Sequence, residues 1–542
     1  MHVLRSLLGS RANDDGRRVG GQRYGPRGRW LLATLFLAWW ALATAQTPGG
    51  VIQVIAGEGA MVFVDGSFVG TTTVSQGGLV ILDVVPGSRA VRVVAGGEVV
   101  AETSVEVTAG GVTTVEASVA AATPRDAGPA VQQTSDDGGW SLQFGTPQHE
   151  RVNAVAAGAN GAIAVVGFTA GPLLGPHLGS NDVFVRVFDH AGAVVWESQF
   201  GTPDNDAAWG VAVDARGHVA VVGHTTGALA APNAGRFDAF VRVHGPTGEL
   251  LWEDQFGTEG DEMLFAAAYR PDGSLAVVGR TNGGLFGPNL GGHDAYVRVY
   301  RGEDGAVLWQ DQFGSAAADA AWDVAALDDG MIVVVGSVSG RLVVPRYGGR
   351  DAFVRAYASD GTVAWQDQFG TVADDVAFAV ATDGVERITV VGSTEGSLFG
   401  GERVGAREPF FRVYDARGTV LRQAQYFARS AGSASVFHAV AYDGAGNAVI
   451  GAGLNGQVSE AYITANTNLW TLVLDANSAT AWQDFVPSPG SDSVHAVAVD
   501  ASGRLVIAGQ VTGDVFGAGA GNADAFVQVL PAPDGVELTP RR

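Results

Sequence analysis

Short runs of alternating apolar and polar residues fill the chain from residue 139 to residue 532, and they return at a nearly constant interval. One run joins a Trp to Gln-Phe-Gly and starts at Trp140, Trp196, Trp252, Trp309 and Trp365, with Leu421 and Trp482 in altered copies. A second run reads Asp-Ala-Phe-Val-Arg and starts about 57 residues apart, at Asp182, Asp238, Asp294, Asp351, Glu408 (altered), Asn468 (altered) and Asp524. A fixed period of this length indicates a repeat architecture.

Each repeat contains four runs with the period of two that is typical of β-strands. In chain order they read W-x-x-QFG, AVAVD, LAVVG-x-T and DAFVRV, as in residues 196–243. Four short strands per repeat indicate a propeller blade, and seven such blades close into a ring. The sequence therefore predicts an all-β fold with a seven-bladed propeller over residues 139–532.

The phase of the repeat predicts how the ring closes. The array starts on the run from Trp140 to Phe144 and ends on the run from Asp524 to Val529. Each of these strands would have an open edge, and pairing the two would remove both edges. We therefore expect them to lie side by side in one blade.

The lengths of the loops predict two different faces. The AVAVD and DAFVRV runs end in short turns such as 215–217 and 360–361, which are hairpins on one face. The loops at 202–206 and 225–237 are longer and belong to the opposite face. We expect the longest of them to cross from the outer strand of one blade to the inner strand of the next. A ligand is expected on this long-loop face, because loops usually carry function.

The order of these runs resembles the SBBP-type β-propeller repeat family, whose units show D-A-F-V, W, FG, D, VD-x-x-G and G-x-T in this succession. The resemblance covers about 390 residues and implies a propeller.

Residues 50–121 show short alternating runs between Gly turns, which predicts a small β-sandwich. The runs 57–66, 70–72 and 86–93 resemble a PEGA domain, although Gly57 stands where that family has a proline. Such domains are non-catalytic modules of surface and envelope proteins, so the resemblance implies a role in attachment or spacing. A generic sandwich with the same turn residues is the alternative.

The termini and the junction between the two units have other patterns. Seven arginines within residues 1–29 precede the apolar run 30–45, which ends in Ala-Thr-Ala. This pattern predicts a signal peptide over 1–45, with an uncleaved anchor as the alternative. Residues 122–138 have the composition of a linker, and 533–542 form a C-terminal tail. We therefore expect an exported protein at the cell surface, outside the cell or in the periplasm, which meets a membrane only through an uncleaved leader.

Composition excludes several classes of function. The 542 residues include no Cys and no Lys, so thiolate metal sites, disulfides and Schiff-base chemistry are absent. The formal net charge of −23 argues against nucleic acid as a partner and favours a cationic or neutral one.

Two series of acids are the first candidates for ligand or cation binding on the long-loop face. One series opens the AVAVD run, and it consists of Asp206, Asp261, Asp319, Asp375 and Asp492, with Glu150 in the first repeat. The other opens the DAFVRV run, and it consists of Asp182, Asp238, Asp294, Asp351 and Asp524, with Glu408. If the DAFVRV strand is innermost, the second series forms a carboxylate ring that would suit Ca²⁺, the one cofactor we consider. The alternative is architectural, because an acid in nearly every repeat can cap a loop or pair with the repeated arginines Arg186, Arg242, Arg298, Arg355 and Arg412.

A more variable position follows the first acid series by three residues. It holds Trp209 and Trp322, and the other repeats place Asn153, Leu264, Phe378, His438 and His495 there. Because His438 and His495 are equivalent in adjacent repeats, they are expected to be neighbours. The position is a candidate for ligand contact, with variable packing between blades as the alternative. The five regular tryptophans are expected to pack between blades.

These observations favour a non-enzymatic binding or scaffold protein of the bacterial envelope, with a polymer, glycan or protein as partner. A propeller enzyme, a lyase or glycan hydrolase with a carboxylate pair in the funnel, is an alternative. A structural surface spacer without a specific ligand is another. The sequence shows no recognisable set of catalytic residues, and it does not identify metal ligands.

Overall fold

The structure is a computed structural model of the whole chain, and it falls into two units, residues 1–121 and 122–542. In the first unit it describes residues 50–55, 61–64, 67–71, 79–84, 86–95, 98–109 and 111–116. In the second it describes 133–134 and 138–532, apart from 345–346, 401–402, 428–432, 444, 456–466, 487–491 and 517–518. The predicted signal peptide, most of the linker and the C-terminal tail lie outside these residues.

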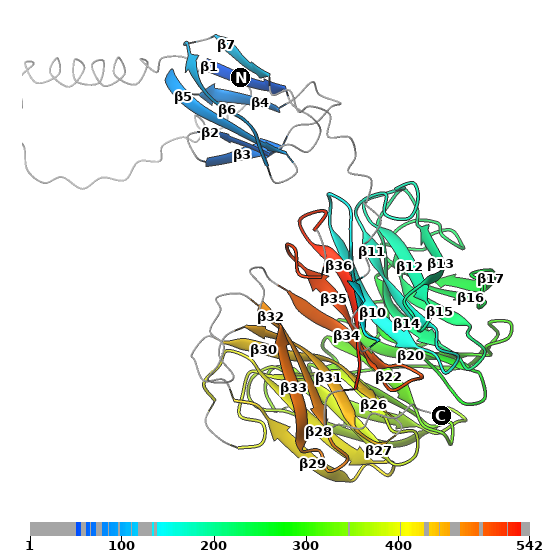
Figure 1. Cartoon of the computed structure of the whole chain (residues 1–542). Helices are drawn as coiled ribbons and strands as arrows, with labels where there is room; N and C mark the ends of the chain where they lie inside the picture. Colours follow the sequence, from blue (N-terminus) through cyan, green and yellow to red (C-terminus); the bar gives the residue numbers. More distant parts are fainter. Residues whose placement is uncertain are drawn as a thin grey trace, which may run out of the picture. The chain divides into compact units, whose positions relative to one another are not determined.

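The first unit contains two β-sheets (Figure 1). One has the order β4-β1-β7 and the other β3-β2-β5-β6. The strands are β1 (Gly50–Ile55), β2 (Met61–Val64), β3 (Ser67–Thr71), β4 (Leu79–Val84), β5 (Gly87–Ala95), β6 (Glu98–Val107) and β7 (Val112–Glu116). Both sheets contribute fully buried side chains, including Ile52 and Val91, so the predicted two-sheet fold is confirmed. Its relation to PEGA domains stays a prediction.

The second unit is a propeller of seven blades, which confirms the predicted fold class (Figure 1). Blades one to three are β10 (Glu150–Ala157), β11 (Ile163–Thr169), β12 (Asp182–Phe188), β13 (Val194–Phe200); β14 (Asp206–Val213), β15 (Val219–Thr225), β16 (Asp238–His244), β17 (Leu250–Phe256); and β18 (Glu262–Tyr269), β19 (Leu275–Thr281), β20 (Asp294–Tyr300), β21 (Val307–Phe313). Blades four to six are β22 (Asp319–Ala326), β23 (Ile332–Val338), β24 (Asp351–Tyr357), β25 (Val363–Phe369); β26 (Asp375–Thr382), β27 (Arg387–Thr394), β28 (Glu408–Asp415), β29 (Val420–Gln425); and β30 (Ala434–Tyr442), β31 (Ala448–Asn455), β32 (Thr467–Leu474), β33 (Thr480–Val486).

Blade seven joins the two ends of the array. It contains β34 (Ser493–Val499), β35 (Leu505–Val511), β36 (Asp524–Leu530), β9 (Trp140–Phe144) and the short β8 (Gln133–Thr134). Strands β36 and β9 are antiparallel, with Ala525 opposite Phe144 and Val529 opposite Trp140. The predicted closure of the ring is therefore confirmed.

The order of strands within a blade differs from one of our expectations. The AVAVD strand is innermost, because residues of β10, β14, β18, β22, β26, β30 and β34 line the central channel. The DAFVRV strand is third, and the Trp-containing strand is outermost. The longest loop, such as 226–237, therefore joins the second and third strands of one blade, and the shorter 201–205 loop crosses to the next blade. The expected crossover was wrong, although both loops do lie on the same face.

A β-bulge interrupts every inner strand at the same place. In blade two Ala208 pairs with Gly223 and Gly210 pairs with Val222, which leaves Trp209 as the extra residue. A Cβ atom on Gly223 would lie 2.0 Å from the carbonyl oxygen of Ala207. The repeated Gly of the LAVVG-x-T run thus allows the close approach of the two strands in six blades, whereas blade six has Ala452 at this position.

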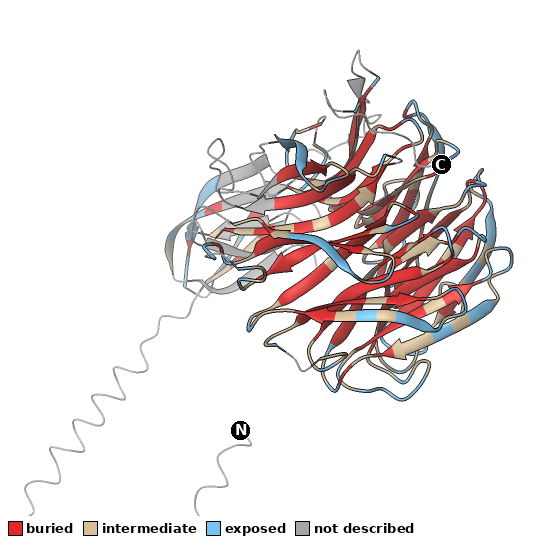
Figure 2. Ribbon diagram, turned by 90° about the horizontal axis from the view of Figure 1, so that it is seen from below, coloured by how far each residue is buried: buried red, intermediate tan, exposed pale blue. Residues whose placement is uncertain are grey.

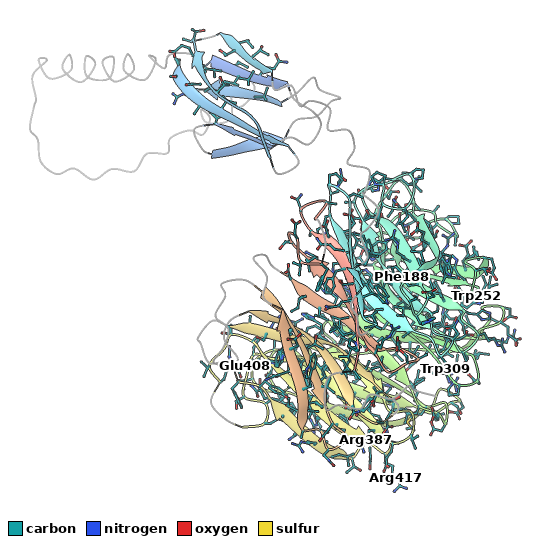
Figure 3. All side chains as sticks on the ribbon, viewed as in Figure 1. Phe188, Trp252, Trp309, Arg387, Glu408 and Arg417 are labelled. Carbon is teal, nitrogen blue, oxygen red and sulfur yellow. The ribbon has the colours of Figure 1, made fainter. Side chains whose placement is uncertain are left out.

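The core lies between successive blades, and the second and third strands of each blade are the most continuously buried, as in β11 and β12. Figure 2 shows the buried residues in the interior of the blades and exposed residues at their margins. The outer tryptophans contact the next blade, as expected: the Trp252 and Trp309 rings lie 5.4 Å from those of Tyr300 and Tyr357. Figure 3 labels both tryptophans toward the outer edge of the propeller. The repeated arginines cover the Phe of the preceding blade, as Arg298 covers Phe256 at 4.1 Å.

Candidate binding site in the central channel

The acids that open the third strands are buried and connect two segments of their own blade. In blade two, one oxygen of Asp238 accepts hydrogen bonds from the Gln255 amide at 3.0 Å and the Ala234 N–H at 2.9 Å. The same two bonds recur at Asp182, Asp294, Asp351, Glu408 and Asp524. The predicted carboxylate ring at the channel mouth is wrong, because this strand is third and its acids are covered.

The acids that open the inner strands are buried as well, and they hold the crossover between blades. Both the N–H and the hydroxyl of Thr202 donate to Asp206. The same arrangement recurs at Glu150, Asp319 and Asp375, and Asp492 accepts from Thr512. In blade three the residue with this role is Glu262, which accepts from Thr258. The expected residue, Asp261, accepts from Asn282 and lies 3.5 Å from Arg236.

The two series meet at five of the seven blade junctions. A Cβ atom on Gly201 would lie 2.8 Å from an oxygen of Asp182 and 2.9 Å from one of Asp206. Burial, together with the nearby Asp182 charge, raises the pKa of Asp206. The loop-capping alternative is therefore confirmed for these acids. The repeated arginines bond outer-strand residues instead, as Arg242 pairs with Glu253 at 2.7 Å.

The bulge position forms a ring of side chains around the channel. Its members are Asn153, Trp209, Phe265, Trp322, Phe378, His438 and His495, and all seven line one cavity of about 280 Å³. In blade three the member is Phe265 and not the expected Leu264, which is fully buried. We call this set, with Arg151, the channel ring.

Contacts run around the channel ring without a break. The centroid distances are 6.3 Å for Trp209–Phe265, 4.6 Å for Phe265–Trp322, 6.3 Å for Trp322–Phe378, 6.1 Å for Phe378–His438 and 5.9 Å for His438–His495. Arg151 completes the circle: its Nη2 lies 3.0 Å from Nδ1 of His495, and its guanidinium lies 5.8 Å from the Trp209 ring. The amide of Asn153 instead donates to the Ala208 carbonyl at 2.8 Å. The expected proximity of His438 and His495 is confirmed.

The polar groups of the aromatic members point to the neighbouring strands. The indole N–H of Trp209 donates to Nδ1 of His224 at 2.9 Å, and that of Trp322 donates to the Ser337 hydroxyl at 3.2 Å. Burial lowers the pKa of His438 to about 4, and burial with the Arg151 charge lowers the pKa of His495 well below 6.5. The histidines are therefore neutral near pH 7, and Arg151 is the cation of the channel ring.

One carboxylate lies in the cavity wall just beyond the channel ring. Asp323 occupies a position that is Ala or Gly in the other blades, and it accepts from the N–H groups of Val380 and Val324, both at 2.8 Å. Burial raises the pKa of Asp323 to about 7. Because Val380 belongs to the next inner strand, Asp323 links blades four and five across their channel edges.

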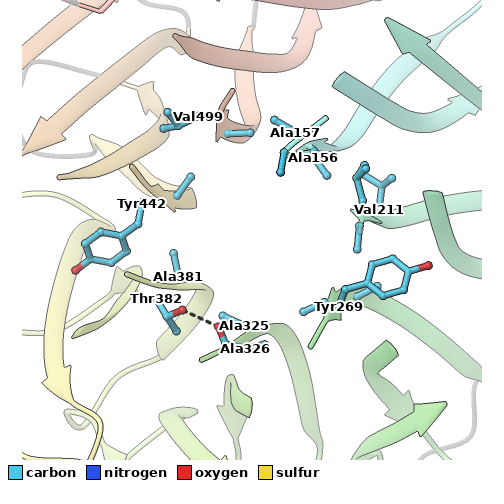
Figure 4. A pocket seen from close by; sticks show the side chains of 18 of the residues that line it. Ala156, Ala157, Val211, Tyr269, Ala325, Ala326, Ala381, Thr382, Tyr442 and Val499 are labelled. Carbon is cyan, nitrogen blue, oxygen red and sulfur yellow. Dashed lines mark hydrogen bonds between the residues drawn. The ribbon is translucent and has the colours of Figure 1, made fainter. Parts of the chain in front are cut away.

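The channel continues toward the hairpin face as a second cavity of about 350 Å³. Small side chains such as Ala157, Ala325 and Ala381 surround its open centre (Figure 4). The rings of Tyr269 and Tyr442 point away from that centre (Figure 4). The channel is therefore chemically distinctive at the long-loop side, where the ring lies.

Within the described part of the chain, no three His, Asp or Glu side chains are grouped so that they could hold a metal ion. Calcium binding stays a prediction. None of the described residues forms a helix that is long and apolar enough to cross a membrane.

Sequence reasoning missed Arg151, Phe265, Arg280 and Asp323. A count from the Thr or Ser after Gln-Phe-Gly would have found two of them, Phe265 and Asp323. The acid is four residues later, the ring member seven and the Asp323 position eight, as at Thr202, Thr258 and Ser315. Arg280 lies on a second strand, opposite Met263, and only the pairing of the strands reveals it.

No protein-family model matches the chain. One similar protein is the Regulatory protein FlaEY of Caulobacter vibrioides, which is 27% identical over 178 residues, or 30% of this chain and 18% of that protein. The chain thus spans about a fifth of the length of this relative.

Similar solved structures include the propeller domain of the Trilobed protease from Pyrococcus furiosus (13% identity, TM-score 0.40, covering 72% of this chain and 95% of that one). BamB from Moraxella catarrhalis follows (14%, 0.33, 75% and 99%), with a quinohemoprotein alcohol dehydrogenase from Comamonas testosteroni (12%, 0.39, 74% and 77%). At such low identities these structures say nothing about a ligand.

Proposed function

We propose that this is a non-enzymatic binding protein of the bacterial envelope, which binds its ligand at the channel ring. The observation that carries the proposal is the set of six aromatic or imidazole side chains that line a cavity of about 280 Å³. Arg151 joins the first and last of them through Trp209 and His495. Every blade supplies the same bulge, yet the side chains differ. A concave site lined by aromatic residues with few polar groups is typical of ligand binding.

The predicted export signal supports a location outside the cytoplasm, and a glycan, polymer or protein of the envelope is the expected class of partner. The described wall of the ring cavity contains one carboxylate, Asp323, and the close acid pairs such as Asp182 and Asp206 are buried. We therefore favour binding over hydrolysis.

Retention of the full chain on an immobilised panel of envelope glycans and polymers tests the proposal. Wild type should be retained by at least one member, and Trp209→Ala and Trp322→Ala should reduce that retention by about tenfold or more. Tyr347→Ala is the matched control, because this aromatic side chain is 52% exposed on the long-loop face outside the ring. Equal retention of all variants, or loss only with Tyr347→Ala, would place binding elsewhere, and no retention at all would favour a structural spacer.

A further inference from the structure

Most arginines that cover an aromatic ring in the propeller have an acid beside them. Arg186, Arg242, Arg298, Arg355 and Arg412 each lie 4.1–4.6 Å from a Phe ring of the preceding blade. Each also has a carboxylate within 2.7–3.5 Å, from Glu197, Glu253, Asp254, Asp311 and Asp367 in that order. These guanidinium groups are therefore neutralised by the fold itself.

Arg151 and Arg280 differ from this set. Arg151 lies over Trp209 at 5.8 Å, and Arg280 lies over Phe265 at 5.7 Å. Among the described residues neither has a carboxylate within ion-pair distance, and this distinguishes them from the other five. The Nε of each is also buried without a hydrogen-bond partner, a feature that Arg355 and Arg412 share. Arg280 contacts the Met263 sulfur at 3.6 Å, and the nearby Asp261 is engaged by Asn282 and Arg236.

The surroundings of these two arginines form one continuous patch. Trp209 and Phe265 are edge to face at 6.3 Å, and His224 stacks on Trp209 at 6.2 Å. Burial and the Arg280 charge lower the pKa of His224 to about 4, so this imidazole adds no charge near pH 7. The patch thus offers two guanidinium groups, one over Trp209 and the other over Phe265.

An unpaired, partly buried guanidinium is unfavourable until an anion joins it, and a carboxylate fits its planar fork with two hydrogen bonds. Flat apolar groups stack on indole and phenyl faces. We propose that the channel ring takes a ligand with a carboxylate on a ring, bound by Arg151 or Arg280 and stacked on Trp209 or Phe265. This inference rests on the proposed function and names its ligand class, despite the chain's net charge of −23.

Calorimetric titration of the full chain with two matched pairs of probes tests this class. One pair is a galacturonate dimer and a galactose dimer, and the other is phenylacetate and 2-phenylethanol. The first pair tests an acidic sugar as the ligand, and the second tests an aromatic acid. Both acids carry a carboxylate on a ring-containing molecule. In wild type at low salt, the acid of at least one pair should bind about tenfold or more tightly than its neutral partner.

Arg151→Gln and Arg280→Gln should each reduce this preference for the acid by about threefold or more, and the double variant should abolish it. Arg151→Lys should retain part of it, since the charge remains without the planar fork. Arg186→Gln is the control: this arginine also covers a Phe, but Glu197 already pairs with it at 2.8 Å. Thermal melting of each variant establishes that it is folded.

Equal affinity for acid and neutral partners, an unchanged preference in the double variant, or no binding of any of the four probes would overturn the inference. If a neutral glycan is retained on the panel in a Trp209-dependent way, the proposed function survives and the ligand class fails. If neither the panel nor the probes bind, both fail.

Discussion

The blade junctions and the channel ring are both built seven times from one repeat, yet they use the repeat in opposite ways. At the junctions nearly every blade places the same chemistry: an acid opens the strand, and its oxygens accept from a loop N–H and a Gln or Thr. At the channel ring every blade places the same backbone bulge, but its side chain varies among Asn, Trp, Phe and His. The acids satisfy the loop N–H groups that recur from blade to blade, so their identity is kept. The side chain at the bulge has no such fixed partner and can vary.

The comparison also separates net charge from local charge. Many of the acids that give the chain its charge of −23 are consumed within the fold, as Asp238 and Asp206 are. In contrast, the ring brings Arg151 to the channel without an acid beside it. The overall charge therefore predicts solubility and long-range steering, but it does not predict the sign of the site.

Gly223→Ala should have the largest effect on stability, because it disturbs the backbone pairing that forms the bulge. The added Cβ would lie 2.0 Å from the Ala207 carbonyl oxygen, so the bulge that presents Trp209 must shift. We expect a loss of about 3 kcal/mol in the free energy of unfolding by urea denaturation. Gly287→Ala is the control, since a Cβ there meets nothing within 4 Å. Equal stability of the two variants would show that the bulge does not need this glycine.

Asp238→Ala and Trp209→Phe test the contrast directly. Loss of the carboxylate leaves the Ala234 N–H without an acceptor and leaves the Gln255 amide with the Gly227 carbonyl alone, which should cost about 2 kcal/mol. Asp238→Asn keeps an acceptor and should cost less. Trp209→Phe should cost about 1 kcal/mol, because Phe already occupies this position in blades three and five. Chemical denaturation measures all three, and a Trp209→Phe cost as large as that of Asp238→Ala would make the ring architectural too.

The sequence alone was sufficient for the number of blades, the closing pair of strands and the two loop faces. These follow from the period of the repeat and the phase at which it starts and stops. The order of strands within a blade was not predictable in the same way. A continuous repeat of four strands does not show which of the four lies nearest the channel. Our interpretation of the longest loop as the crossover failed for this reason.

The candidate site was predicted in part. Variation between the repeats at one position identified Trp209 and Trp322 as candidates. The equivalent positions of His438 and His495 in adjacent repeats identified these two as neighbours. The adjacent acids Asp261 and Glu262 shifted our alignment of the third repeat by one residue, and Phe265 was lost with it. Arg151 was missed because a charged residue at the start of a strand gives no sign of the channel until the inner strand is known.

Asp323→Asn tests a carboxylate that occurs in one blade only, in contrast to the acids repeated at the blade junctions. Burial raises the pKa of Asp323 from 3.8 to about 7. Between these pH values the unfolded chain has released the proton that the folded chain still holds, so this group lowers stability as pH rises from 4 to 7. Asn carries no such penalty, so the variant's stability relative to wild type should rise by about 1–3 kcal/mol between pH 4 and pH 8. The Asn amide has one acceptor for the two N–H groups, which sets a constant cost at every pH.

The difference in stability between Asp323→Asn and wild type should level off as the pH falls below 4, where the carboxyl is protonated in both states. Urea denaturation from pH 4 to pH 9 measures it, and the other titrating groups cancel in the difference. A constant offset across this range would mean that Asp323 only supplies an acceptor for Val380, and that its charge plays no part.

Ser478→Gly should have the smallest effect on stability. It tests whether a residue that differs from the other repeats always has a role in function. The outer hairpins of blades one to five turn on a Gly with positive φ, such as Gly248 at 91° and Gly361 at 86°, but blade six has Ser478 at 57°. A left-handed conformation is strained for Ser and not for Gly, so the substitution should stabilise the protein by about 0.5–1 kcal/mol. Thermal and urea denaturation measure the gain, and binding on the glycan panel should not change. A gain in stability with unchanged binding would mark this variation as drift, whereas lost binding would extend the functional surface from the channel to the hairpin face of blade six.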